Sequence, residues 1–124
     1  MIDHVSIAVC DLRRAAAFYE SVLATLGYAT LETRATTVGF GKTYPDLWIN
    51  HRPDMQPAAP DSGAHLCLRA SSREMVDAFH AAALSSGGES DGAPALLPQH
   101  GEGYYAAFIR DPDGNRIEAV TFVK

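Results

Sequence analysis

The 124-residue sequence carries one pattern of predicted elements twice, and the second copy begins about half a chain after the first. His4 and His65 are 61 positions apart, and each lies in the first predicted strand of its copy. The same offset aligns Phe18 with Phe79 and Gly27 with Gly88. Two copies of one supersecondary unit restrict the fold strongly, because each copy buries its apolar face against a neighbouring unit.

The first copy predicts one strand, one helix and three further strands. Residues 2–9 place β-branched side chains at alternate positions, as a half-buried strand does. Asp11 suits the N-cap of a helix whose apolar residues recur at helical spacing, and Gly27 suits the end of that helix. Short strands are then expected at residues 28–33, 36–41 and 46–50.

The second copy predicts the same order. A strand at 64–70 precedes a helix that Ser71 or Ser72 caps and that the Gly87-Gly88 pair ends. A short extended piece near 89–92 and a turn-rich loop follow. The last two strands are expected at 104–110 and 115–123, joined by the turn sequence Asp111-Pro112-Asp113-Gly114.

These elements predict an α+β fold in which two tandem βαβββ modules form a single domain over residues 1–124. Module 1 covers residues 1–52 and module 2 covers residues 63–124. The segment between them, residues 53–62, holds three prolines and is expected to be a linker, because prolines interrupt helices and central strands.

Charge and composition argue against several kinds of partner. Lys and Arg number 10 against 15 Asp and Glu, so nothing favours binding to a nucleic-acid backbone. No apolar run nears the roughly 20 residues that span a bilayer, and the N-terminus lacks a secretory signal pattern. We therefore expect a cytoplasmic protein without a membrane partner, in which Cys10 and Cys67 are reduced thiols packed in the core.

Two histidines and one carboxylate form the most specific chemical pattern. His4 and His65 occupy equivalent places in the two copies, so related packing puts both at one shared cavity. Glu118 stands among apolar residues of the last strand, where an ionised carboxylate needs a partner such as a cation. We predict one divalent ion per chain at these three residues, which leave positions open for substrate or water; Fe, Mn, Ni and Zn are not distinguished. Ordinary strand histidines and an exposed glutamate are the alternative.

Motifs along nearly the whole chain carry a family resemblance. They lie at residues 4–12, 18–19, 26–28 and 63–68, and the most specific is Phe-Ile-Arg-Asp-Pro-Asp-Gly-Asn-Arg-Ile-Glu at 108–118. The sequence resembles the vicinal oxygen chelate superfamily, which includes glyoxalase I, extradiol dioxygenases, fosfomycin-modifying thiol transferases and bleomycin-resistance proteins. That resemblance implies a glyoxalase-like fold, with curved mixed sheets around a central cavity and a substrate that chelates a metal through neighbouring oxygens.

The resemblance assigns the metal ligands to His4, His65 and Glu118, and its fourth ligand position falls on Trp48. An indole cannot coordinate a metal ion, which argues against a glyoxalase I activity. Trp48 is instead expected to face the cavity as a wall for a flat or apolar substrate. The further expected substrate contacts are Ser6, Tyr105 and Phe108, and the other aromatic residues expected near the cavity are Phe40, Tyr44 and Tyr104.

The expected function is that of a metal-dependent lyase or isomerase, thiol transferase or dioxygenase with a small oxygen-chelating substrate. The metal would act as a Lewis acid that stabilises an enolate or alkoxide. The alternatives are a metal-free protein of the bleomycin-resistance type that sequesters a small molecule or drug, and a structural remnant in which the three ligands persist without turnover. The family commonly pairs modules from two chains, so we expect a homodimer with its sites at or near the interface. Whether one chain or two supplies the ligands is left open.

Overall fold

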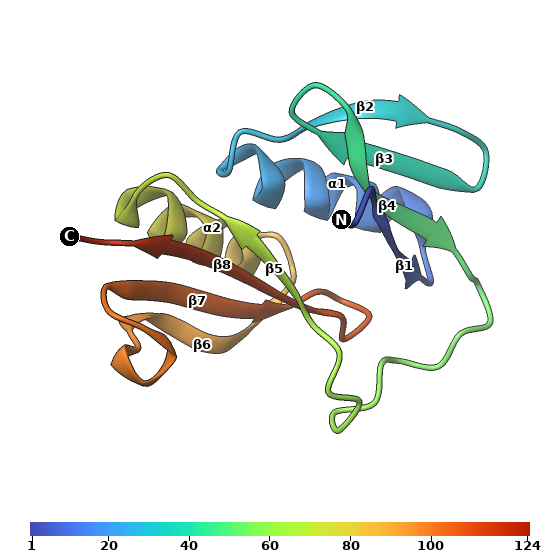
Figure 1. Ribbon diagram of the computed structural model, residues 1–124. Coiled ribbons are helices and arrows are strands. Elements are labelled where there is room, and N and C mark those ends of the chain that lie inside the picture. Colours follow the sequence, from blue (N-terminus) through green and yellow to red (C-terminus); the bar gives the residue numbers. More distant parts are fainter.

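The computed structural model describes residues 1–124 and confirms the predicted order of elements in the first module (Figure 1). Asp11 caps the helix by accepting a hydrogen bond from the Arg14 amide, and Gly27 adopts a left-handed conformation (φ = 84°) after the helix ends. The first strand begins one residue after His4. The elements are β1 (Val5–Val9), α1 (Leu12–Ala24), β2 (Ala29–Thr33), β3 (Thr37–Gly41) and β4 (Pro45–His51).

The second module repeats this order, with one strand longer than predicted. β6 runs through Pro94 to Leu96, whereas the sequence predicted only a short piece near 89–92. β6 tolerates the proline because it is the outer strand of its sheet and its pairing with β7 is irregular there. The elements are β5 (Leu66–Arg69), α2 (Arg73–Ser85), β6 (Glu89–Leu96), the 3-10 turn η1 (Pro98–His100), β7 (Tyr104–Arg110) and β8 (Arg116–Phe122).

Each module forms one four-stranded mixed sheet. Sheet 1 has the order β1-β4-β3-β2, and sheet 2 has the equivalent order β5-β8-β7-β6. In the parallel pairs, Ser6 lies opposite Trp48 and Cys67 lies opposite Glu118. Because Ser6 and Cys67 are 61 positions apart, Trp48 is the repeat counterpart of Glu118. The α+β fold of two βαβββ modules is confirmed.

One apolar core joins the two modules. α1 packs on sheet 1, α2 packs on sheet 2, and the two helices contact each other (Figure 1). The counterparts Phe18 and Phe79 are both buried in this core. Neither helix has the length and apolar character that crossing a bilayer requires.

Each sheet has a second face that its helix does not cover. Side chains alternate along a strand, so residues next to core residues point to this other face. We call these surfaces face 1, which carries Ser6, Trp48 and Asn50, and face 2, which carries His65, Cys67, Tyr104, Phe108 and Glu118.

The turn between β7 and β8 fastens module 2 to module 1. The Tyr19 hydroxyl on α1 donates a hydrogen bond to Asp111 Oδ2 (2.5 Å), and Asn115 Nδ2 donates to the Ala8 carbonyl (2.9 Å). Burial raises the pKa of Asp111, while the hydrogen bonds from Tyr19 and Asn115 oppose that rise. Buried polar contacts therefore help to hold the two modules together.

One detail refines the predicted end of the second helix, and another corrects the predicted placement of the cysteines. The left-handed glycine after α2 is Gly87 (φ = 101°), whereas Gly88 permits a close approach, because a Cβ there would lie 2.7 Å from the Arg110 carbonyl oxygen. Neither cysteine belongs to the core. Cys10 is part-buried, and Cys67 is exposed because its neighbours on β5 are the residues that turn towards α2.

Candidate functional site

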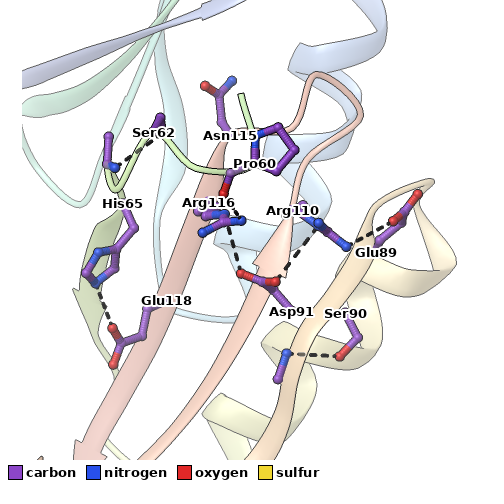
Figure 2. Close-up of polar contacts among 12 residues, drawn as sticks. Pro60, Ser62, His65, Glu89, Ser90, Asp91, Arg110, Asn115, Arg116 and Glu118 are labelled. Atoms are coloured by element: carbon purple, nitrogen blue, oxygen red, sulfur yellow. Dashed lines mark hydrogen bonds and ion pairs between the residues drawn. The ribbon is translucent and has the colours of Figure 1, made fainter. Parts of the chain in front are cut away.

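The main polar cluster on face 2 surrounds the buried carboxylate of Glu118. This residue lies near the middle of β8 and is only 3% exposed, so its oxygens need partners within the protein. His65 Nε2 lies 3.0 Å from Glu118 Oε1 (Figure 2), and the Tyr104 hydroxyl donates a hydrogen bond to Oε2. The polar partners of Glu118 within the chain are therefore an imidazole and a phenol.

Three neighbouring strands place these side chains. β8, which carries Glu118, lies between β5, which follows His65, and β7, which begins at Tyr104. The Tyr104 ring contacts the rings of Phe122 and His100, with centroids 5.4 Å away in each case. Burial and the hydrogen bond to Glu118 raise the pKa of Tyr104, so its hydroxyl remains a donor. The His65 side chain is 49% exposed, which leaves the pair accessible from solvent.

Cys67 adds a thiol beside the pair. It lies opposite Glu118 in the register of β5 and β8. Although the residue as a whole is exposed, desolvation of its thiol and the nearby Glu118 carboxylate raise the pKa of Cys67 to about 11. The side chain is therefore a neutral thiol near pH 7 and not an activated nucleophile.

A cavity of about 190 Å³ opens next to His65 on face 2. Phe108, an expected substrate contact, lines this cavity together with Asp91 and Arg116. Arg116 Nε lies 3.7 Å from an Asp91 carboxylate oxygen, and Arg116 also donates a hydrogen bond to the Pro60 carbonyl (Figure 2). The sequence did not single out Arg116, which here attaches the linker to the cavity wall.

Face 1 carries an indole where face 2 carries the carboxylate. The Trp48 ring lies over Gly39, where a Cβ would come within 2.8 Å of the ring. The guanidinium of Arg34 lies over the same indole, 5.0 Å from its centroid. Trp48, Ser6 and His4 line one cavity of about 470 Å³. The sequence did not single out Arg34, because its place just after a short strand carries no local signal that it would stack on Trp48.

His4 is not gathered with His65 and Glu118 within one chain. Its Nδ1 lies 2.7 Å from an Asp3 carboxylate oxygen, and the Tyr44 hydroxyl donates to the same oxygen (3.0 Å). His4 and His65 both line a groove of about 370 Å³ along the module boundary. No three His, Cys, Asp or Glu side chains of the chain form a group that could hold a metal ion. The predicted ligand set is thus one pair and one separate histidine.

Tyr105 does not lie on the site face. It is buried in the core, and its hydroxyl donates a hydrogen bond to Asp77 on α2 (2.6 Å). Alternation along β7 puts Tyr104 on face 2 and Tyr105 on the opposite face. The expectation that Tyr105 contacts substrate is therefore corrected, and Tyr104 is the tyrosine of face 2.

The His65–Glu118 pair fits part of a divalent metal site. Imidazole nitrogen and carboxylate oxygen bind such an ion at about 2.0–2.2 Å, so two donors at a right angle lie about 3.0 Å apart. The observed separation of His65 Nε2 and Glu118 Oε1 is 3.0 Å. These two residues can hold a divalent ion if a further donor completes the site.

Comparisons with known proteins agree with this architecture. A sequence profile of the Glyoxalase/Bleomycin resistance protein/Dioxygenase superfamily matches residues 1–119. Among solved structures, a glyoxalase/bleomycin resistance protein from Albidiferax ferrireducens is 33% identical, with 95% of this chain and 96% of that chain covered and a TM-score of 0.83. No curated protein matches the chain.

More distant structures share the fold. A glyoxalase/bleomycin resistance protein/dioxygenase family enzyme from Burkholderia phytofirmans is 19% identical, covers 98% of both chains and has a TM-score of 0.75. A glyoxalase-related enzyme from Fulvimarina pelagi is 16% identical, with 97% of this chain and 86% of that chain covered and a TM-score of 0.74. The profile match spans both modules, and this chain belongs to the Glyoxalase/Bleomycin resistance protein/Dioxygenase superfamily.

Proposed function

We propose that this chain is a metal-dependent enzyme that acts on a small substrate through neighbouring substrate oxygens. The observation that carries the proposal is the His65–Glu118 pair on the open face 2, with its donor atoms 3.0 Å apart. In this proposal one divalent ion is held by His65, Glu118 and His4. When bound, the ion supplies Lewis-acid chemistry that stabilises negative charge on a substrate oxygen.

The charge of the pair favours a cation. Glu118 is buried, and its hydrogen-bond partners are the neutral Tyr104 hydroxyl and the imidazole of His65. The neighbouring Cys67 is a neutral thiol near pH 7. A divalent ion bound beside this carboxylate would offset the cost of burying its charge.

The cavity beside His65 limits the size of the substrate. Its volume of about 190 Å³ is below the range of about 300–1,000 Å³ that is usual for drug-sized ligands. Phe108 offers an apolar contact there, and the half-exposed His65 connects the cavity to the pair. A compact substrate with oxygens at the end nearest His65 fits this arrangement.

The missing donor points to a second copy of the chain. Face 1 carries His4 near Trp48, and face 2 carries the pair, while the outer strands β1 and β5 each have one unpaired edge. Face 2 also carries the exposed side chain of Phe122 (46%). In the proposed homodimer, face 1 of one copy covers face 2 of the other and brings His4 to His65 and Glu118. Two such sites form per dimer.

Elemental analysis tests the metal site directly. Protein purified without a polyhistidine tag or chelator should hold about one divalent ion per chain. His65→Ala and Glu118→Gln should lose that ion, because each removes a donor of the pair. The control is His80→Gln, since His80 lies on α2 and bonds Ser90 away from face 2. Full metal content in both site variants would contradict the proposed site.

A metal-free binding protein is the second candidate. The stack of Arg34 on Trp48 in the larger cavity favours it, because an aromatic ring and a guanidinium need no metal to bind a flat anion. Trp48 is the single tryptophan, so its fluorescence distinguishes the two functions. Co²⁺ bound at the proposed dimer site should quench it, whereas a metal-free binder predicts no saturable quenching.

A further inference from the structure

The two oxygens of the Glu118 carboxylate have different partners. Oε1 faces His65 Nε2 at 3.0 Å, and Oε2 accepts a hydrogen bond from the Tyr104 hydroxyl. A carboxylate can bind a metal ion through one oxygen or through both. A hydroxyl that already occupies Oε2 therefore restricts how the carboxylate can turn towards an ion.

Tyr104 is itself held in place from several sides. Its ring meets the Phe122 ring edge-on and also contacts His100 of the η1 turn. The preceding Gly103 has φ = 71°, and a Cβ there would lie 2.0 Å from the Val123 carbonyl oxygen. This close approach fixes where β7 begins, and hence where the Tyr104 side chain starts.

We infer that Tyr104 is a positioning residue for the proposed metal site. Its hydrogen bond holds Glu118 so that only Oε1 is offered to the ion. The inference rests on the proposed function, because it concerns the divalent ion that His65 and Glu118 are proposed to bind together. A partner of this kind orients its ligand, and loss of such a partner typically lowers metal affinity about 10–100-fold.

The adjacent residue provides a matched control. Tyr105 is also a tyrosine on β7, and its hydroxyl also donates a hydrogen bond to a carboxylate, that of Asp77. Its bond lies on the core side of the sheet, away from Glu118. Phenylalanine at either position removes one hydroxyl and leaves the ring, so the two variants differ in which carboxylate loses its partner.

The experiment titrates the full-length protein and its Tyr104→Phe and Tyr105→Phe variants with Co²⁺ at one pH. Isothermal titration calorimetry gives the Kd, and thermal unfolding without metal reports any general loss of stability. We expect the Kd of Tyr104→Phe to rise about 10–100-fold and that of Tyr105→Phe to change less than about twofold. Equal changes in both variants, or none in Tyr104→Phe, would overturn the inference.

An infrared readout separates positioning from a purely structural role. The separation between the two carboxylate stretching bands is larger when one oxygen binds a metal ion than when both do. The metal-induced difference spectrum should therefore show a narrower separation in Tyr104→Phe than in the parent, with Glu118→Gln identifying the bands. The same separation in parent and variant would overturn the inference.

Failure of the proposed function gives a different result. If the parent protein binds no Co²⁺, or if Glu118→Gln leaves its Kd unchanged, the proposed metal site itself is wrong and the positioning role is overturned with it. If binding depends on Glu118 but not on Tyr104, the metal site stands and only the positioning role of Tyr104 fails.

Discussion

Faces 1 and 2 share a strand arrangement but differ in where their large and charged side chains lie. Trp48 on β4 and Glu118 on β8 are counterparts, and their neighbours on the next strand are Gly39 and Phe108. On face 1 the Trp48 ring occupies the position that Glu118 has on face 2, and it lies over Gly39. On face 2 the ring is one strand further out, where Phe108 covers Gly92; a Cβ there would lie 2.9 Å from that ring.

The two faces therefore share the packing of a large ring on a glycine but differ in their polar side chains. Each face holds one large ring over one glycine, but only face 2 pairs a buried carboxylate with a histidine. Face 1 keeps its histidine, His4, beside an indole that cannot bind a metal ion. A complete site in the proposed function therefore needs both unlike faces.

The largest expected effect contrasts the two counterparts directly. Glu118→Gln should weaken metal binding more than about 100-fold, because it removes a ligand and not merely a partner of one. Trp48→Ala should leave metal content unchanged and weaken ligand binding by about 0.5–1.5 kcal/mol beyond the lost contact area. Metal titration of both variants checks this difference. Similar metal loss in the two would mean that the counterparts do not differ as proposed.

A second pair of counterparts, 61 positions apart, lies on the helices. Tyr19 on α1 is buried and donates to Asp111, whereas His80 on α2 bonds Ser90 near the surface. Tyr19→Phe should lower the free energy of unfolding by about 1.5–3 kcal/mol, the range for hydrogen bonds to charged groups. His80→Gln should change it far less. Urea unfolding of both variants measures the contrast. An equal loss would mean that the hydrogen bond between Tyr19 and Asp111 contributes no more to stability than the contact of His80 with Ser90.

Installing the acid of face 2 on face 1 should strengthen metal binding. In Trp48→Glu a carboxylate takes the fourth ligand position of the family pattern, and we expect about tenfold tighter binding, or about 1.4 kcal/mol. Calorimetric titration against the parent protein is the measurement. An unchanged Kd would mean that residue 48 does not face the ion in the assembled site.

The smallest expected effect is a pH dependence below pH 6.5, which His80 contributes and its counterpart Tyr19 does not. Burial lowers the pKa of His80 below its ordinary value of 6.5. In the window between that lowered pKa and 6.5 the unfolded chain binds the proton more readily, so stability falls as the pH falls through it. His80→Gln should show a shallower loss of stability below pH 6.5. Parallel pH profiles for parent and variant would contradict this.

The order of elements could be predicted because local signals agree with the fold. Alternating β-branched residues, the caps at Asp11 and Ser72 and the turn at 111–114 each act within a few residues. β6 was predicted too short because Pro94 argues against a central strand, and nothing local reveals that this strand is at the edge.

The site could be predicted only in part. Glu118 and His65 were found from a carboxylate in an apolar strand and from the repeat, and the structure brings them together. Tyr105 was placed on the wrong face because a shift of one residue exchanges the two faces of a strand. Where His4 lies relative to the pair depends on how modules pack, and periodicity within one chain carries no information about that.

The most direct test of the proposed assembly mixes two full-length variants that each lack one proposed metal ligand. His4→Ala and Glu118→Gln variants, each metal-free alone, are unfolded together and refolded at equal concentration, with mixed dimers verified by native mass spectrometry. If sites form between copies, each mixed dimer has one complete site, so metal content should recover to about one ion per four chains. No recovered metal in verified mixed dimers would contradict the account.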